Sequence, residues 1–418
     1  MILSNISVPL LGMVDTGVTG HLENAAYLGA VAIGSTIFGF LYTGVNFLRM
    51  GTTGIAAQQF GANDFDGLRV ALGQALIVAL AIAALLLVLQ APIGAAAISL
   101  IGPDAAVADF ADQYFSIRIW SAPATLANFA LIGWFLGLQN ARVPLIVVLV
   151  INVTNIILDL VLVVVIGMKV DGVAIASVIS EFTGLAVGLA FVVRELKRHS
   201  GHWEVSKLTT LREYTAFFGI NAHLFVRTMA LVFTLTFITA QSARLGGLIL
   251  AANAILMNFQ NLLAFALDGF AHAAEALVGK AVGEKDRAAL QRSVVLALRW
   301  SLIVAAGFSA FFWLAGPMLV AVLTDLPDIR TTTLRYLPWL IVSPLIAVWS
   351  YLYDGVFVGA TLAREMRNIM VISAFVIFIP VWYALQFLGN DGLWLSFMLF
   401  LASRGIGMHV YYRRRTII

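Results

Sequence analysis

Polar residues that could exchange a proton or bind a cation lie inside otherwise apolar segments of this sequence. In one such segment, Asn152, Asn155 and Asp159 are spaced by three and four residues, so a helix would place them on one face. Asp15 lies in another apolar segment near the N-terminus. Two carboxylates with amides beside them can share a proton or supply oxygen ligands to a sodium ion, and the residue types leave both chemistries open.

Hydroxyl and amide groups in two further segments could complete this site. Tyr114, Ser121 and Asn128 recur every seven residues, so a helix would again align them on one face. Ser177 adds a hydroxyl group in a later segment. Taken singly, such groups more often hold helices together than form a site, but together with two acids they favour a functional one. For Asp15 the alternative is a hydrated position at the end of its helix.

The second half of the sequence carries a different set of polar residues. Five of them follow helical spacing along one apolar segment: Asn258, Asn261, Asp268, His272 and Glu275. Asp354 lies in a later segment close to Tyr351, and an acid beside aromatic rings is a setting that can bind an organic cation. We therefore predict a cation-binding site formed by Asp354, Asp268, Asn261 and Tyr351. Two structural alternatives stay open: neutralisation of these acids by Arg227, Arg299 or Arg404, and simple solvation of Glu275.

The composition identifies an integral membrane protein. Hydrophobic residues make up 61% of the 418 residues and charged residues only 11%, with a mean hydropathy of +0.96. Soluble domains carry about 25% charged residues. The apolar residues form runs of about 20, which suit spanning helices, and they lack the ten-residue alternation of a β-barrel. The expected fold class is an all-α membrane protein.

Several functional classes are excluded by what the sequence lacks. It contains no cysteine, which excludes disulfides, thiolate metal sites and cysteine nucleophiles. The net charge of +3 is too small for nucleic-acid binding. Walker A, Gly-x-Ser-x-Gly and His-Glu-x-x-His motifs are absent and the histidines are scattered, so we expect no enzyme, no cofactor and no protein-bound metal apart from the sodium alternative.

Apolar windows predict twelve spanning helices. They centre roughly on residues 2–20, 26–50, 69–90, 112–137, 143–166, 172–194, 214–240, 247–278, 290–314, 335–360, 368–388 and 392–411. Sixteen Lys and Arg residues fall in the even-numbered connections and the C-terminal tail, against four in the odd-numbered connections. Both termini should therefore be cytoplasmic. The chain starts inside an apolar helix without a cytoplasmic lead-in, so we expect a few native residues to precede Met1.

The two halves of the sequence align at one constant offset, the separation between Gly133 and Gly355. At this offset Gly133–Arg142 matches Gly355–Arg364, Gly61–Leu68 matches Gly283–Leu290, and Tyr114 matches Tyr336. Each repeat would hold six helices, so both halves enter the membrane in the same orientation, as parallel repeats with a site between them near the midplane. We predict a six-helix lobe at 1–198, a cytoplasmic linker at 199–213 and a second six-helix lobe at 214–418.

Four segments carry a resemblance to a known family: Leu11–Leu22, Asn155–Asp159, Gly172–Ser177 and Leu352–Arg364. They resemble the multidrug and toxic compound extrusion (MATE) family, most closely its prokaryotic branch of DNA-damage-inducible protein F type, over essentially the whole chain. The resemblance implies an antiporter that expels organic cations in exchange for protons or sodium ions. It implies that Asp15 is the essential acid of the first helix. It also implies an amino-terminal network of Tyr114, Asn128, Asn155, Asp159 and Ser177, where Ser177 replaces a common threonine.

We therefore expect a secondary multidrug antiporter that works by alternating access, as a multi-pass monomer in a bacterial or archaeal cytoplasmic (inner) membrane. Its partners would be small-molecule drugs, mainly organic cations, and the lipid bilayer. Its coupling ion would be the proton, with sodium held by Asp15, Asn155 and Asp159 as the alternative. Two rivals are a lipid-linked oligosaccharide flippase of the same superfamily, which usually has more basic residues in its cavity, and an ion channel or receptor, which would show no gradient-driven efflux.

Asp15→Asn should abolish drug efflux while the protein still folds and inserts into the membrane. A carboxyl group among apolar helices can exchange a proton near neutral pH, whereas the amide that replaces it cannot. Efflux assays in cells, with membrane levels of the variant measured in parallel, check this. Wild-type efflux by the variant would show that another group couples transport to the ion gradient.

Overall fold

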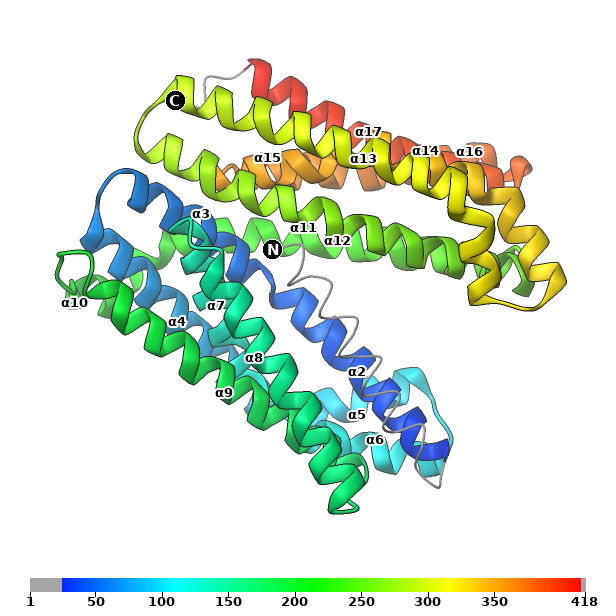
Figure 1. The fold of residues 1–418 in the computed structure, drawn as a ribbon, viewed down its shortest axis with the longest axis horizontal. Helices are drawn as coiled ribbons and strands as arrows, with labels where there is room; N and C mark the ends of the chain where they lie inside the picture. Colours follow the sequence, from blue (N-terminus) through cyan, green and yellow to red (C-terminus); the bar gives the residue numbers. More distant parts are fainter. Residues whose placement is uncertain (1–24, 415–418) are drawn as a thin grey trace. The chain divides into compact units, whose positions relative to one another are not determined.

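The computed structural model of the protein describes residues 25–414, and every regular element in that range is helical (Figure 1). The helices up to Leu196 are α2 (Ala25–Val45), α3 (Phe47–Gly61), α4 (Phe65–Val88), α5 (Gln90–Ile101), α6 (Ala105–Arg118), α7 (Ala122–Gly137), α8 (Arg142–Asp159) and α9 (Val170–Leu196). The later helices are α10 (Val205–Thr209), α11 (Thr215–Arg244), α12 (Gly247–Gly283), α13 (Arg287–Leu323), α14 (Pro327–Gly359), α15 (Ala363–Val371), α16 (Ile379–Leu385) and α17 (Asn390–Arg414). The predicted all-α class is confirmed.

Eleven helical segments in the described range are long and apolar enough to cross a bilayer, from Ala26–Gly61 to Asn390–Arg414. They correspond to the second to twelfth predicted spans. The first predicted span, residues 2–20, lies outside the described residues. The short apolar helix α5 between two of the spans was not expected from the sequence. The chain is thus a multi-pass membrane protein.

Contacts divide the chain into two compact units, the first ending at Phe217 and the second containing the rest. The segment 199–213, which the sequence marks as a linker, belongs to the first unit by this division. Arg69 of α4 holds the start of that segment, because its guanidinium donates to the backbone oxygens of Leu196 and His199 at 3.0 and 2.8 Å.

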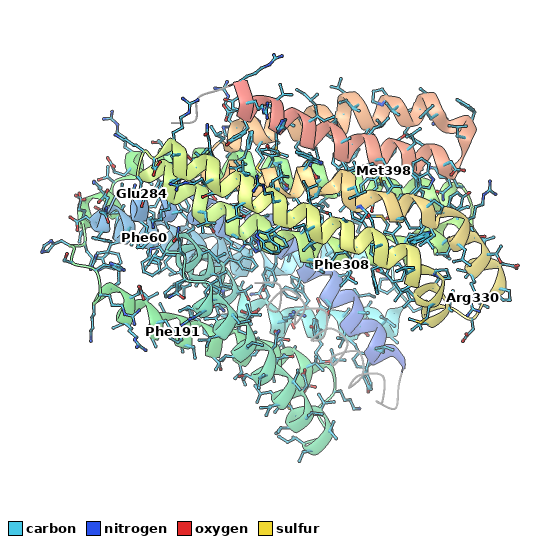
Figure 2. All side chains as sticks on the ribbon, turned by 45° about the horizontal axis from the view of Figure 1, so that its top comes forward. Phe60, Phe191, Glu284, Phe308, Arg330 and Met398 are labelled. Atoms are coloured by element: carbon cyan, nitrogen blue, oxygen red, sulfur yellow. The ribbon has the colours of Figure 1, made fainter. Side chains whose placement is uncertain are left out.

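Large apolar side chains cover the outside of the spanning helices. Trp313, Leu314 and Val322 on α13, for example, are 69%, 73% and 78% exposed. Figure 2 shows Glu284 and Arg330 at opposite ends of the second unit, so α13, which connects them, runs along its length. An apolar exterior between polar ends suits a helix surrounded by lipid, where no water is available to polar groups.

The internal repeat is visible in the backbone. Four non-glycine residues of the described range have a left-handed conformation, and they form two pairs related by the same offset as Gly133 and Gly355. Asn63 and Lys285 both have φ of 56°, while Gln139 and Thr361 have φ of 59° and 55°. Each closes the C-terminal end of a long helix, a position where left-handed residues are common. Because non-glycine residues rarely adopt this conformation, its recurrence confirms the predicted internal repeat.

Glycines permit the same close helix contact in each unit. A Cβ atom on Gly133 of α7 would lie 2.4 Å from the backbone oxygen of Arg49 in α3. A Cβ atom on Gly355 of α14 would lie 2.2 Å from the backbone oxygen of Ala271 in α12. Arg49 and Ala271 are related by the same offset as the two glycines, so the repeat includes helix packing as well as loops. Small residues at helix contacts let backbones approach closely in a membrane.

Gly355→Ala should lower the free energy of unfolding by about 1–3 kcal/mol, because the added methyl group overlaps the Ala271 carbonyl and pushes α14 away from α12. Thermal unfolding in detergent measures the change. Gly307→Ala in α13 is the matched control, since nothing lies within 4 Å of its added Cβ, and it should be neutral or slightly stabilising. Equal stability of the two variants would contradict the close contact.

Candidate functional site

The polar face predicted for the fifth span is buried in the first unit. Asn155 and Asp159 of α8 are 1% and 0% exposed, whereas Val153 and Ile157 on the same helix are 52% and 54% exposed. The apolar side of α8 therefore faces outward and its amide and carboxylate face inward. This inverted arrangement is expected of a helix that packs in lipid, since polar side chains avoid the hydrocarbon.

Asn155, Asp159 and Ser177 meet where α8 packs against α9. In the amide orientation that gives both ends a partner, Asn155 Nδ2 donates to Asp159 Oδ2 at 3.0 Å, and its Oδ1 accepts from the backbone N–H of Ser177 at 3.2 Å. Ser177 itself is 6% exposed. A π-helical turn, Leu160–Val165, begins directly after Asp159, and such turns are frequent at functional sites. The structure thus brings three of the predicted residues together.

Tyr114 and Ser121 lie on the broken fourth span, where the 3-10 turn Ile119–Ser121 separates α6 from α7. The buried Tyr114 accepts a hydrogen bond from Arg118, whose guanidinium also lies over the Phe38 ring, 5.1 Å from its centroid. The Ser121 Oγ atom lies 3.0 Å from the hydroxyl oxygen of Tyr42 in α2. Arg118 was not singled out from the sequence, although a basic residue inside an apolar span is itself a signal of function or pairing.

Asn128 contacts an acid that the sequence analysis missed. Its Nδ2 donates to Glu181 Oε2 at 2.9 Å and to the backbone oxygen of Glu181 at 3.1 Å. Glu181 is half-buried and lies four residues after Ser177 in α9. That spacing puts both residues on one helical face and could have identified Glu181 as part of the set.

Asp15, the remaining residue predicted for this site, lies outside the described residues. Among the residues that are described, no group of three or more His, Asp or Glu side chains could hold a metal ion. A sodium site that includes Asp15 is not addressed by that observation.

In the second unit Asp354 is bound by two arginines. Arg404 of α17 donates to Asp354 Oδ2 at 2.7 Å, and Arg227 of α11 donates to the same oxygen. Asp354, Arg404 and Arg227 are 7%, 2% and 9% exposed. Arg227 and Arg404, two of the three arginines expected to neutralise buried acids, therefore do so at Asp354.

The other residues predicted to bind a cation are distributed around this ion cluster. Tyr351 interacts electrostatically with Asp354 and with both of its arginines. The half-buried Asp268 interacts with Tyr351 and Arg404. Asn261 is exposed on α12. Glu275, for which solvation was the alternative, is only 2% exposed, so it is a buried group. Cation binding by these residues stays a prediction, and the ion pairs of Asp354 favour its structural alternative.

A neutral hydrogen-bond network joins α12 to α17 and was also missed from the sequence. Asn253 Nδ2 donates to Asn390 Oδ1 at 2.7 Å, and Asn390 Nδ2 donates back to Asn253 Oδ1 at 3.0 Å. Trp394 Nε1 donates to the same Asn253 oxygen at 2.9 Å. All three side chains are buried. Reciprocal amide pairing satisfies both side chains without any charge, which is typical of interhelical bonding in membranes.

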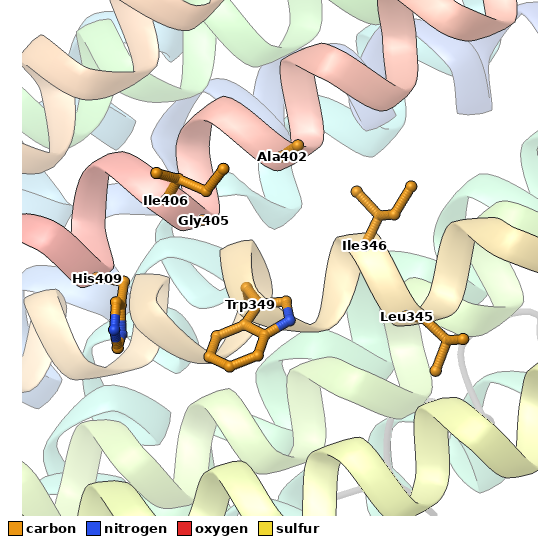
Figure 3. Close-up of a pocket in the computed structure, with 7 residues that line it drawn as sticks. All are labelled: Leu345, Ile346, Trp349, Ala402, Gly405, Ile406 and His409. Atoms are coloured by element: carbon orange, nitrogen blue, oxygen red, sulfur yellow. The ribbon is translucent and has the colours of Figure 1, made fainter.

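An apolar cavity of about 370 Å³ lies between α14 and α17 (Figure 3). It is lined by Leu345, Ile346, Trp349, Ala402, Gly405, Ile406 and His409. The rings of Trp349 and His409 are in edge contact, with their centroids 5.8 Å apart. No acidic residue is among those lining residues, so this cavity offers apolar contact to a cation but no counter-charge.

Asp354→Asn should lower the free energy of unfolding by about 3–5 kcal/mol, because it leaves two buried guanidinium groups without their carboxylate. Thermal unfolding of the purified protein measures this. Asp325→Asn is the control: Asp325 is fully exposed and pairs with Arg330 at 3.7 Å, so its loss should leave stability unchanged. If both variants unfold at the same temperature, the buried ion pairs do not hold the second unit together.

Comparison with protein families matches residues 1–161 and 224–384 to the MatE family. The chain is 43% identical to DNA damage-inducible protein F of Escherichia coli (strain K12) over 414 residues, which cover 99% of this chain and 90% of the relative. It is 24% identical to the probable multidrug resistance protein NorM of Acinetobacter baylyi, over 92% of this chain and 87% of the relative.

Solved structures share the fold over nearly the whole chain. A crystal structure of MATE in the bent conformation superposes with a TM-score of 0.89 at 18% identity, covering 99% of this chain and 92% of that chain. An outward-facing multidrug resistance MATE family transporter of the MOP superfamily gives a TM-score of 0.88, also at 18% identity, with 99% and 93% coverage. From these matches and the repeated helical fold, the chain belongs to the MatE family of membrane transporters and is not an enzyme.

Proposed function

We propose that this protein is a secondary antiporter that exports organic cations in exchange for protons. The observation that carries the proposal is the buried contact between Asn155, Asp159 and Ser177 in the spanning helices of the first unit. Support also comes from relatives, because NorM of Acinetobacter baylyi is described as a probable multidrug resistance protein. Another relative, 24% identical, is the human multidrug and toxin extrusion protein 1.

Protonation of Asp159 would change the contact between α8 and α9. The ionised carboxylate can only accept hydrogen bonds, and it accepts one from Asn155 Nδ2. A proton on Oδ2 would make that oxygen a donor facing the amide hydrogens, unless one of the two groups turns. If the amide turns, Asn155 no longer presents an oxygen to the backbone N–H of Ser177. Proton binding is therefore linked to helix packing, as exchange by alternating access requires.

The orientation of Asn155 favours the proton over sodium. In the orientation that gives both ends of the amide a partner, its Oδ1 accepts from the Ser177 N–H and its Nδ2 points at Asp159. A sodium ion at Asp159 would need the amide oxygen as a ligand, so the amide would have to rotate and leave the Ser177 contact. We assign coupling to Asp15 and Asp159, with Asn155 and Ser177 as positioning residues and Tyr114 and Asn128 as further members of the network.

The two buried arginines of the second unit are engaged with Asp354, so they do not favour an anionic substrate. The flippase alternative requires basic groups directed at an anionic substrate, whereas Arg227 and Arg404 both bond Asp354. Asp268 and Tyr351 lie next to that cluster and supply a carboxylate and an aromatic ring to an organic cation. We propose that they contact the substrate, that the chain works as a monomer, and that both termini face the cytoplasm of a prokaryotic cell.

Proteoliposomes that contain the purified protein test this function. Adding a fluorescent organic cation should release protons in the wild type, and an imposed pH gradient should drive cation movement without sodium. In Asp159→Asn, the change of transport rate with pH should be at least tenfold smaller than in the wild type, because the amide cannot exchange a proton.

Asp104→Asn is the control variant for this experiment. It makes the same change at an exposed residue before α6 whose side chain makes no capping hydrogen bond, so transport should keep the wild-type pH dependence. If Asp159→Asn also keeps the wild-type pH and sodium dependence, Asp159 is a structural residue. If the wild type requires sodium and releases no protons, the proposed coupling ion is wrong.

A further inference from the structure

We propose that Glu181 forms a second proton-binding site in the first unit, one helical turn from Ser177, and that it passes protons between the Asp159 contact and the cytoplasmic side. The inference rests on the proposed proton antiport and extends it to a carboxylate that neither the sequence analysis nor the family comparison assigns. It is carried by the geometry of α9 against α6 and α7.

The position of Glu181 is unusual for an acid. Its helix neighbours Ile179 and Phe182 are each 44% exposed on the apolar outside of α9, whereas Ser177 and Ser180 are 6% and 1% exposed. Glu181 thus continues the polar side of a spanning helix whose other side meets lipid. An ionisable group at such a position usually faces a polar cavity or a partner, and it is a candidate for proton transfer.

The carboxyl group of Glu181 is hydrogen-bonded by a neutral amide. Asn128 Nδ2 donates to Oε2 at 2.9 Å and also to the Glu181 backbone oxygen at 3.1 Å, so the carboxyl group is tied to α7 through a neutral amide. Among the described residues that face it, the charged and titratable ones are Arg118 of α6 and Tyr42 of α2. Neither interaction fixes the side chain in the way that the two arginines fix Asp354.

Arg118 makes the protonation state of Glu181 consequential. A guanidinium group stays charged at every physiological pH, so the Glu181–Arg118 pair changes from neutral to a charge of +1 when Glu181 takes up a proton. Arg118 also donates to Tyr114 and lies over Phe38 of α2. The proton on Glu181 therefore alters the charge that α2 and α6 share, in a region where charge is weakly screened.

Glu181 lies one helical turn along α9 from the Asp159 contact. In the amide orientation that gives both ends a partner, Asn155 accepts from the Ser177 backbone N–H. Ser177 and Glu181 are separated by four residues, so they are neighbours on one helical face. From Ser177, the helix continues past Glu181 to the basic stretch after Arg194, which the positive-inside rule places in the cytoplasm. Glu181 consequently lies on the cytoplasmic side of the Asp159 contact, where a relay to that compartment must pass.

Glu181→Gln in the full chain, reconstituted in proteoliposomes with ethidium as the cation, tests the relay. Two rates are measured: ethidium–ethidium exchange without a pH gradient, and ethidium movement driven by a pH gradient. The exchange rate of the variant should stay within about twofold of the wild-type rate. Its gradient-driven rate should be at least tenfold lower than that of the wild type. Glu181→Asp should restore most of that rate. Glu195→Gln is the control and should behave as the wild type. Glu195 lies near the C-terminal end of the same helix and pairs with Arg198.

The double variant Glu181→Gln, Arg118→Gln distinguishes a structural role of Glu181 from proton transfer. It removes both charges of the Glu181–Arg118 pair at once. If Glu181 only neutralises Arg118, the double variant regains gradient-driven transport, and the inference is overturned. If Glu181 carries protons, the loss persists although the protein folds and exchanges ethidium. If the wild type couples ethidium movement to protons and Glu181→Gln keeps the wild-type gradient-driven rate, the inference is overturned while the proposed function stands. A wild type that moves ethidium without releasing protons overturns the proposed function and the inference with it.

Discussion

The absence of water from the hydrocarbon core determines how this protein arranges its polar residues. A buried polar group in a spanning helix must find a partner in the protein, because lipid offers none. In the first unit Asp159 meets Asn155, and in the second unit Asp354 meets Arg227 and Arg404. The helix faces, the glycine contacts between backbones and the exposed apolar surface all follow from the same constraint.

Much of the fold follows from periodicity and self-similarity, which are local properties of a sequence. The constant offset between the two halves predicts matching turns at Asn63 and Lys285, although no single residue type there would demand a left-handed conformation. The spacing of Asn155 and Asp159 predicts their shared face, because an α-helix brings residues four apart together. Helix breaks such as the turn Ile119–Ser121 could not be located, since they depend on packing against other helices.

The pairing of charges could not be predicted, because each partner comes from a distant part of the chain. Arg227 and Arg404 are 127 and 50 residues away from Asp354, and Asn128 is 53 residues away from Glu181. Spacing along one helix indicates which side chains share a face, but it does not show which face of another helix they meet. For that reason Asp354 looks like a cation site in the sequence and like an ion-pair centre in the structure.

The two repeats surround their buried carboxylates with partners of different chemistry. Asp159 contacts an amide that can act as donor or acceptor. Protonation of Asp354 would leave two guanidinium groups facing each other at a buried position, and such uncompensated charge is strongly destabilising. Asp159 is thus hydrogen-bonded by an amide, whereas Asp354 is tied to two arginines. One backbone frame therefore holds a carboxylate–amide contact in the first unit and a buried ion-pair cluster in the second.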